Sequence, residues 1–204
     1  MIQYLKMAQY AAKSYTDSAT MIVVNNTVAH LYEEDTTIIA IRGTDDCADW
    51  LQNLNRCKVP YVIDGVSYGS VHSGFLHELE SIYPWLNNKI AEGRRIEIVG
   101  HSLGGAIAVL LGLYLSKTRS QHISVTTFGT PRIGNRRFHN MCTSPNLNIV
   151  RIYNFADVIT HIPFIGYYHI GDPVRIYNTN TNVCKIGKNH SIYNYIEILH
   201  THHI

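Results

Sequence analysis

The spacing of apolar residues predicts how the first part of the chain folds. One face of a helix would collect four apolar positions near the start: Ile2, Leu5, Ala8 and Ala12. This helical spacing predicts an amphipathic helix to about residue 15. Short runs rich in β-branched and aromatic residues follow, and they predict strands near residues 21–24, 28–32 and 36–42. A polar stretch over residues 43–58 then predicts a long loop.

In the second half of the chain, apolar runs of strand length alternate with longer apolar segments. Strands are predicted near residues 95–99, 122–128 and 148–154, and helices near residues 75–91, from 103 and after 134. This alternation is typical of βαβ crossovers. Nearer the C-terminus, the pattern predicts a hairpin near residues 173–186 and a last helix from about residue 191. We therefore predict an α/β fold in one domain over residues 1–204, with a mostly parallel central sheet, antiparallel N-terminal strands and flanking helices.

Composition and charge narrow the class of protein. The 204 residues are 46% hydrophobic, which is typical of a globular chain and not of a disordered one. The formal net charge is +2 and Lys and Arg form no run, so we expect no nucleic-acid partner. The apolar run over residues 103–115 is too short to span a bilayer, so we expect no transmembrane segment. The sequence does not indicate an oligomeric state.

The N-terminus and the cysteines bear on the compartment. Residues 1–15 lack the basic region and apolar run of a secretory signal, so we expect an intracellular, cytoplasmic protein and leave secretion open. The four cysteines, which show no CxxC or Cys/His metal spacing, are Cys47, Cys57, Cys142 and Cys184. This spacing favours free thiols, with a Cys47–Cys57 disulfide left open.

The segment "GHSLG", residues 100–104, is the strongest candidate for chemistry. It has the pattern G-x-S-x-G and lies between a predicted strand and a predicted helix, which is the context of a nucleophile elbow. Glycines two residues either side of Ser102 make room for a sharp turn that exposes its hydroxyl. The same turn puts the Leu103 N–H at a helix N-terminus, where developing negative charge is stabilised. A dinucleotide loop is excluded because the pattern is not G-x-G-x-x-G.

A serine nucleophile requires a carboxylate further along the chain, since the order in this elbow fold is Ser, then Asp or Glu, then His. Asp157 follows a predicted strand by a few residues, at the carboxyl end where sites gather. Asp172 precedes a strand, and Glu197 lies inside the last predicted helix. We therefore predict that Asp157 is the acid, with Asp172 as the next candidate.

The chain has twelve histidines, and several follow Asp157. His161 lies on the same segment as Asp157, and His200, His202 and His203 lie in the C-terminal tail. His190 follows a loop after the last predicted strand and opens the final helix, so this loop can carry its imidazole across to the serine. We predict that His190 is the general base, and His169, in a Gly-rich turn, is the alternative.

Several further segments resemble the class 3 (fungal-type) lipase family of α/β-hydrolases. They are "IRGTDDCADWLQNLN", "VHSGFLHEL", "TFGTPRIGN", "RIYNFADVITHIP", "GYYHIGDPVRIY" and "NHSIYNY", in the family's order. The resemblance runs from about residue 5 to 196. It implies an α/β-hydrolase fold with a catalytic triad of Ser102, Asp157 and His190.

The resemblance also implies the remaining parts of the site. The backbone N–H groups of Thr44 and Leu103 would form the oxyanion hole. A short lid over about residues 45–56 would carry Trp50, Leu51 and Leu54 as substrate-binding residues. The expected activity is hydrolysis of acylglycerol, phospholipid or other esters at a lipid–water interface, through an acyl-enzyme and with no metal or cofactor. A catalytically silent lipid-binding scaffold and an acyltransferase with the same triad remain as alternatives.

Overall fold

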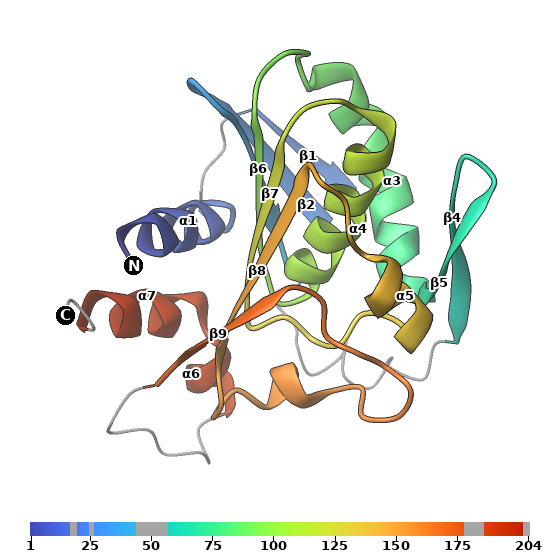
Figure 1. Cartoon of the computed structure of the whole chain (residues 1–204). Helices are drawn as coiled ribbons and strands as arrows, with labels where there is room; N and C mark the ends of the chain where they lie inside the picture. Colours follow the sequence, from blue (N-terminus) through green and yellow to red (C-terminus); the bar gives the residue numbers. More distant parts are fainter. Residues whose placement is uncertain (17–19, 25–26, 44–56, 178–185, 202–204) are drawn as a thin grey trace.

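A central twisted sheet carries the fold of this computed structural model, which describes residues 1–16, 20–24, 27–43, 57–177 and 186–201 (Figure 1). Within these ranges the sheet has seven strands in the order β1-β2-β3-β6-β7-β8-β9. Their bounds are β1 Met21–Val24, β2 Thr27–Glu33, β3 Thr37–Arg42, β6 Ile96–His101, β7 Ile123–Phe128, β8 Leu147–Asn154 and β9 Asp172–Ile176. Strands β1, β2 and β3 pair antiparallel. Strands β3, β6, β7, β8 and β9 pair in parallel with their neighbours in this order. The predicted α/β architecture is confirmed.

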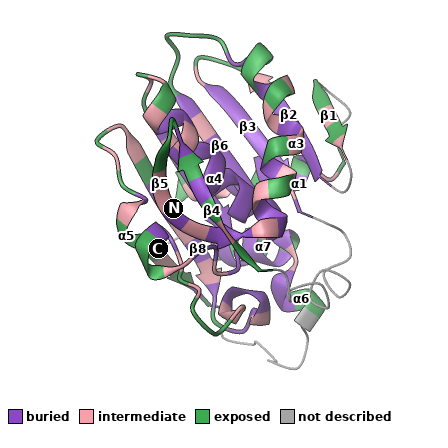
Figure 2. Cartoon of the chain, turned by 90° about the vertical axis from the view of Figure 1, so that its right-hand side faces the viewer, coloured by how far each residue is buried: buried purple, intermediate pink, exposed green. Residues whose placement is uncertain are grey.

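Helices cover both faces of the sheet. On one face lie α3 (Ser73–Lys89) and α4 (Leu103–Thr118), and on the other lie α1 (Ile2–Lys13) and α7 (Ile192–Thr201) (Figures 1 and 2). Successive residues of β3 enter the two cores in turn, with Ile39 in one and Ile38 in the other. A strand buried on both faces has a continuous apolar sequence, as β3 does. Helix α4 is apolar on all sides and correspondingly buried along most of its length.

The strands β4 (Lys58–Ile63) and β5 (Val66–His72) form a separate hairpin that the sequence analysis did not predict. Its turn consists of Asp64 and Gly65, which have φ of 48° and 77°. An Asp-Gly pair between two strands is a strong hairpin signal, so the sequence did contain the information.

The predicted C-terminal hairpin lies only partly within the described residues. Its first arm is the strand β9, which pairs in parallel with β8, and its second arm falls on residues 178–185, which lie outside the described part. Three short helices complete the described chain: α5 (Arg136–Met141), the 3₁₀ helix η2 (Val158–His161) and α6 (Ile186–His190). Among the described residues, no helix has both the length and the apolar character needed to cross a membrane.

Candidate active site

Ser102 occupies a strained turn between β6 and α4. Its backbone has φ 59° and ψ −127°, a region that side chains other than glycine rarely adopt. Two backbone hydrogen bonds hold the turn: Ser102 N donates to Phe128 O (2.9 Å), and Gly105 N donates to Ser102 O (3.0 Å). Strain of this kind persists only where the surroundings fix it, as these bonds do here. The chain thus folds at Ser102 as a nucleophile elbow does.

The glycines beside Ser102 are required by close backbone contacts. A Cβ on Gly100 would overlap the backbone of Gly104, and a Cβ on Gly104 would overlap the carbonyl oxygen of Ile41. Both neighbours are main-chain atoms, which cannot rotate away. The small residues of "GHSLGG" therefore let α4 begin directly against β3 and β6.

Replacing Gly104 with alanine is expected to lower the free energy of unfolding by about 3 kcal/mol, at the upper end of what overpacking costs. Urea unfolding would measure the loss. The matched control is Gly187→Ala, because a Cβ there meets nothing within 4 Å. Equal stability of the two variants would contradict the close contact between α4 and β3.

The structure brings the three predicted residues into one hydrogen-bonded series. The Ser102 hydroxyl donates to His190 Nε2 (2.8 Å), and His190 Nδ1 donates to Asp157 Oδ2 (2.8 Å) and Oδ1 (3.0 Å). All three side chains are buried, and Asp157 has no exposed surface. They come from the start of α4, the end of α6 and the segment after β8, which meet at the carboxyl edge of the parallel strands (Figure 1). Sequence positions almost ninety residues apart thus form a single hydrogen-bonded series from serine to carboxylate.

Tyr195 is a fourth member of this network that the sequence analysis missed. Its hydroxyl donates to Asp157 Oδ2 (2.8 Å) and accepts from Asn154 N (3.1 Å). Burial and the Asp157 carboxylate raise the pKa of Tyr195 well above its ordinary value, so the hydroxyl stays protonated and can donate. Ile159 N donates to the other carboxylate oxygen (3.1 Å). The buried Asp157 carboxylate is therefore hydrogen-bonded at both oxygens, as a buried charge requires.

His101, the residue before the candidate nucleophile, also contacts the site. Its ring lies 4.7 Å from the His190 ring between centroids. Its Nε2 is 2.6 Å from His190 O, and its Nδ1 is 2.9 Å from the Tyr15 hydroxyl. The sequence marked His101 only as the variable position of G-x-S-x-G.

The alternative acids and bases lie elsewhere. Asp172 opens β9 beside Val150, before the carboxyl end of β8 after which Asp157 comes, and Glu197 lies within α7. His161 Nε2 bonds Phe155 O (2.9 Å), and the His169 ring bonds the backbone of Thr160. Among the described residues, no hydrogen bond joins His169 to Ser102 or Asp157.

His169 gives the protein an acid-sensitive stability. Burial, followed by the charges of Arg151 and Arg132, lowers the pKa of His169 from 6.5 to about 3. Between these two values the unfolded chain binds a proton that the folded chain does not, so stability is complete above 6.5 and falls with decreasing pH. This group alone is expected to remove about 1 kcal/mol per pH unit in that window.

Urea unfolding at a series of pH values would measure this slope, and His169→Gln should reduce it by about that amount. An unchanged slope in the variant would show that His169 titrates normally in the folded protein.

Part of the predicted site lies outside the described residues. Thr44 and the lid residues Trp50, Leu51 and Leu54 are in this part, as are Cys47 and Cys184. Leu103 is the first residue of α4, and its N–H belongs to the first turn, where amides have no intrahelical acceptor. Of the described cysteines, Cys57 is exposed, and Cys142 is buried with its pKa raised to about 12 by burial.

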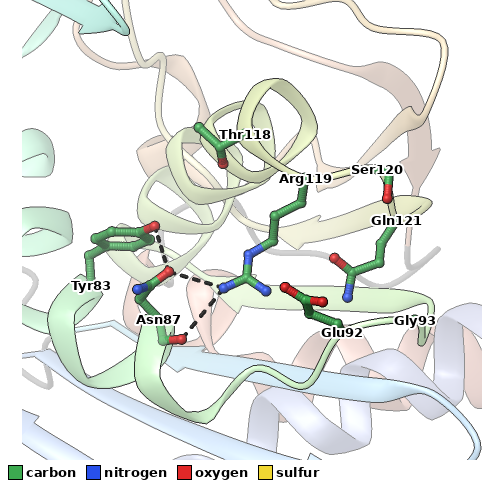
Figure 3. A pocket seen from close by; sticks show the side chains of 8 residues that line it. All are labelled: Tyr83, Asn87, Glu92, Gly93, Thr118, Arg119, Ser120 and Gln121. Carbon is green, nitrogen blue, oxygen red and sulfur yellow. Dashed lines mark hydrogen bonds between the residues drawn. The ribbon is translucent and has the colours of Figure 1, made fainter.

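A polar hollow of about 710 Å³ lies at the far end of α4 from Ser102 (Figure 3). Its central side chain, Arg119, donates to Asn87 Oδ1 (3.0 Å) and to the carbonyl oxygens of Asn87 (3.5 Å) and Ile90 (3.3 Å). These carbonyls belong to the C-terminal end of α3, so Arg119 caps that helix. Helix α4 separates the hollow from Ser102 by about 24 Å. The hollow is therefore a structural feature distinct from the Ser102 site.

Comparison with known proteins gives consistent similarities. Residues 38–167 match the family model described as lipase (class 3). The chain is 34% identical over 149 residues to phospholipase A(1) DAD1, chloroplastic, from Arabidopsis thaliana, covering 62% of this chain and 33% of that protein. It is 28% identical over 183 residues to a lipase of Rhizomucor miehei, covering 84% of this chain and 50% of that protein. The chain thus spans between a third and a half of the length of these relatives.

The fold has solved counterparts. The crystal structure of a lipase from Rhizopus microsporus var. chinensis superposes with a TM-score of 0.74 at 21% identity, covering 95% of this chain and 85% of that one. At this identity the likeness shows the fold, which is that of the α/β-hydrolases.

Proposed function

Because the chain belongs to the class 3 lipase family, we propose that it is a serine carboxylic-ester hydrolase that cleaves acylglycerol or phospholipid esters. The observation that carries this proposal is the hydrogen-bonded series Ser102–His190–Asp157 at the elbow. This series buries a carboxylate and an imidazole beside a serine in a strained turn, which costs stability. A catalytically silent scaffold would gain nothing that offsets this cost.

In the proposed mechanism, His190 Nε2 takes the hydroxyl proton as Ser102 Oγ attacks the ester carbonyl. Asp157 holds the Nδ1–H tautomer of His190 and stabilises the imidazolium that forms. His190 then gives the proton to the leaving alcohol, and an acyl-enzyme remains on Ser102. Water enters, and His190 takes one of its protons as the water oxygen attacks the acyl carbonyl. His190 then returns this proton to Ser102 Oγ as the carboxylic acid leaves, which restores both residues.

The tetrahedral oxyanion needs two hydrogen-bond donors beside Ser102. The Leu103 N–H is one proposed donor, and the Thr44 N–H is the other. Removing one such donor lowers kcat by about 10²–10³-fold in serine hydrolases.

The substrate range follows from the relatives, which are named as a phospholipase and as a lipase. We propose that the substrate is a lipid ester. The expected cytoplasmic location remains a prediction, since the Arabidopsis relative is named chloroplastic.

A substrate panel tests the proposal. Wild-type protein should release acid from p-nitrophenyl butyrate and from either a triacylglycerol emulsion or phosphatidylcholine vesicles, and Ser102→Ala protein should not. Failure of wild-type protein on every ester would contradict the function. Formation of a new ester when an alcohol acceptor is supplied, at the expense of free acid, would indicate an acyltransferase instead.

The proposed lid gives a separate prediction for Trp50. If this side chain meets lipid, Trp50→Ala should lower activity on emulsified triacylglycerol at least about tenfold more than on a soluble short-chain ester. The two assays run on the same preparation measure this ratio. Equal losses on both substrates would place Trp50 in the core or in the acyl pocket.

A further inference from the structure

The position of His101 suggests a role in the reaction proposed above, on which this inference rests. His101 ends β6, and its ring is enclosed by side chains from α6, from α7 and from the turn after α1. The His190 ring stacks at 4.7 Å and 34°, and the Tyr15 and Tyr195 rings meet it edge-on at 6.1 and 6.2 Å. With 5% of its surface exposed, His101 exchanges little with water. An imidazole in such a place is costly unless both nitrogens find partners.

The partners fix the tautomer of His101. A carbonyl oxygen can only accept, so Nε2, 2.6 Å from His190 O, must carry the hydrogen. Burial and the neighbouring His190 lower the pKa of His101 well below its ordinary value, so the ring is neutral. Nδ1 is then without a hydrogen and accepts from the Tyr15 hydroxyl at 2.9 Å. The direction of the series is therefore Tyr15 O–H to His101, and His101 N–H to the His190 carbonyl.

This series joins the base to the elbow at a second point. The His190 ring is hydrogen-bonded to Ser102, and the His190 carbonyl oxygen is hydrogen-bonded to His101, which precedes Ser102 in the chain. Two bonds from one turn to one histidine define both the position of its main chain and the direction of its ring. A neutral His101 also places no second positive charge beside the imidazolium that forms on His190 during each turnover.

From this geometry we propose that His101 is a positioning residue, which as a neutral Nε2–H donor fixes the backbone of His190, and that Tyr15 sets its tautomer. Tyr15 follows α1, so the N-terminal helix contributes to the alignment of the site. Tyr15 also has the Arg42 guanidinium over its ring at 5.0 Å. His101 acts through His190 and touches no substrate atom in this proposal.

The test compares two substitutions of His101. His101→Phe keeps the ring and its stacking but loses the N–H, and kcat for p-nitrophenyl butyrate should fall by about 10- to 100-fold, since small displacements of a catalytic group have effects of this size. KM should change by less than about twofold, because the substrate contacts are untouched. His101→Gln supplies an N–H in a similar place and should recover most of the loss.

A matched control comes from a second histidine that bonds a histidine carbonyl. His139 Nδ1 lies 2.7 Å from His169 O, outside the Ser102 site. His139→Phe should leave kcat unchanged. Tyr15→Phe should lower kcat severalfold in the wild-type background and have no further effect in the His101→Phe background, because Tyr15 acts through His101.

The tautomer can be read without measuring activity. In ¹⁵N NMR of the imidazole groups, His101 should remain in the neutral Nε2–H form at pH values well below the ordinary histidine pKa. Protonation of His101 at the pH of an ordinary histidine, or the Nδ1–H form, would overturn the inference even if His101→Phe fails to fold. The inference would also be overturned if His101→Phe and His101→Gln lost kcat equally and Tyr15→Phe added a further loss in the His101→Phe background. A wild-type protein that hydrolyses no ester would instead defeat the proposed function.

Discussion

Ser102→Ala is expected to lower kcat for ester hydrolysis by about 10⁶-fold, the loss seen when the nucleophile of a serine hydrolase is removed. The substitution deletes the single atom that both bonds His190 and forms the acyl-enzyme. It leaves the two backbone hydrogen bonds of the turn in place, so the fold should be retained. Steady-state rates with p-nitrophenyl butyrate measure the loss, and the urea midpoint checks the fold. Residual activity above about one percent in a folded variant would be incompatible with Ser102 as the nucleophile.

His190→Ala is expected to have an effect of similar size, because nucleophile and base act as one unit. This substitution removes the imidazole that accepts the hydrogen bond of the Ser102 hydroxyl and would take its proton. For the same reason the double variant with Ser102→Ala should be no slower than either single variant. The kcat values of the three proteins, measured under one set of conditions, give this comparison.

The control for His190 is His169→Gln, which changes the alternative base and should keep kcat within about twofold at neutral pH. A His190→Ala variant with near-native kcat would overturn the assignment of the base. Loss of activity in His169→Gln alone would point to His169 instead.

The sequence predicted the sheet well where strands are buried on both faces. Five of the six residues in each of β3, β6 and β7 are buried, and their β-branched residues leave few alternatives to a central strand. The hairpin β4–β5 was missed because one of its faces is exposed and its sequence mixes polar and apolar residues. The direction of β9 depends on its pairing with β8, whose residues precede it by about twenty positions, and the local sequence pattern does not encode this pairing.

The site residues, too, differ in whether the local sequence or distant packing places them. Ser102, Asp157 and His190 were singled out by a local motif and by the order of the chain, and both are visible in a sequence. Tyr195 and Tyr15 reach the site only because α7 and α1 pack together on one face of the sheet. The sequence around each tyrosine indicates a helix or a core position. It does not indicate which group its hydroxyl will hydrogen-bond.

The most direct measurement on the central claim is covalent labelling by a fluorophosphonate probe, followed by peptide mapping. Such probes phosphonylate a serine, with loss of fluoride, only when a base and an oxyanion site activate it. One adduct per chain should form, it should map to Ser102, and it should be absent in the Ser102→Ala and His190→Ala variants. No labelling of the folded wild-type protein, or an adduct on another serine, would contradict the assignment of an activated Ser102.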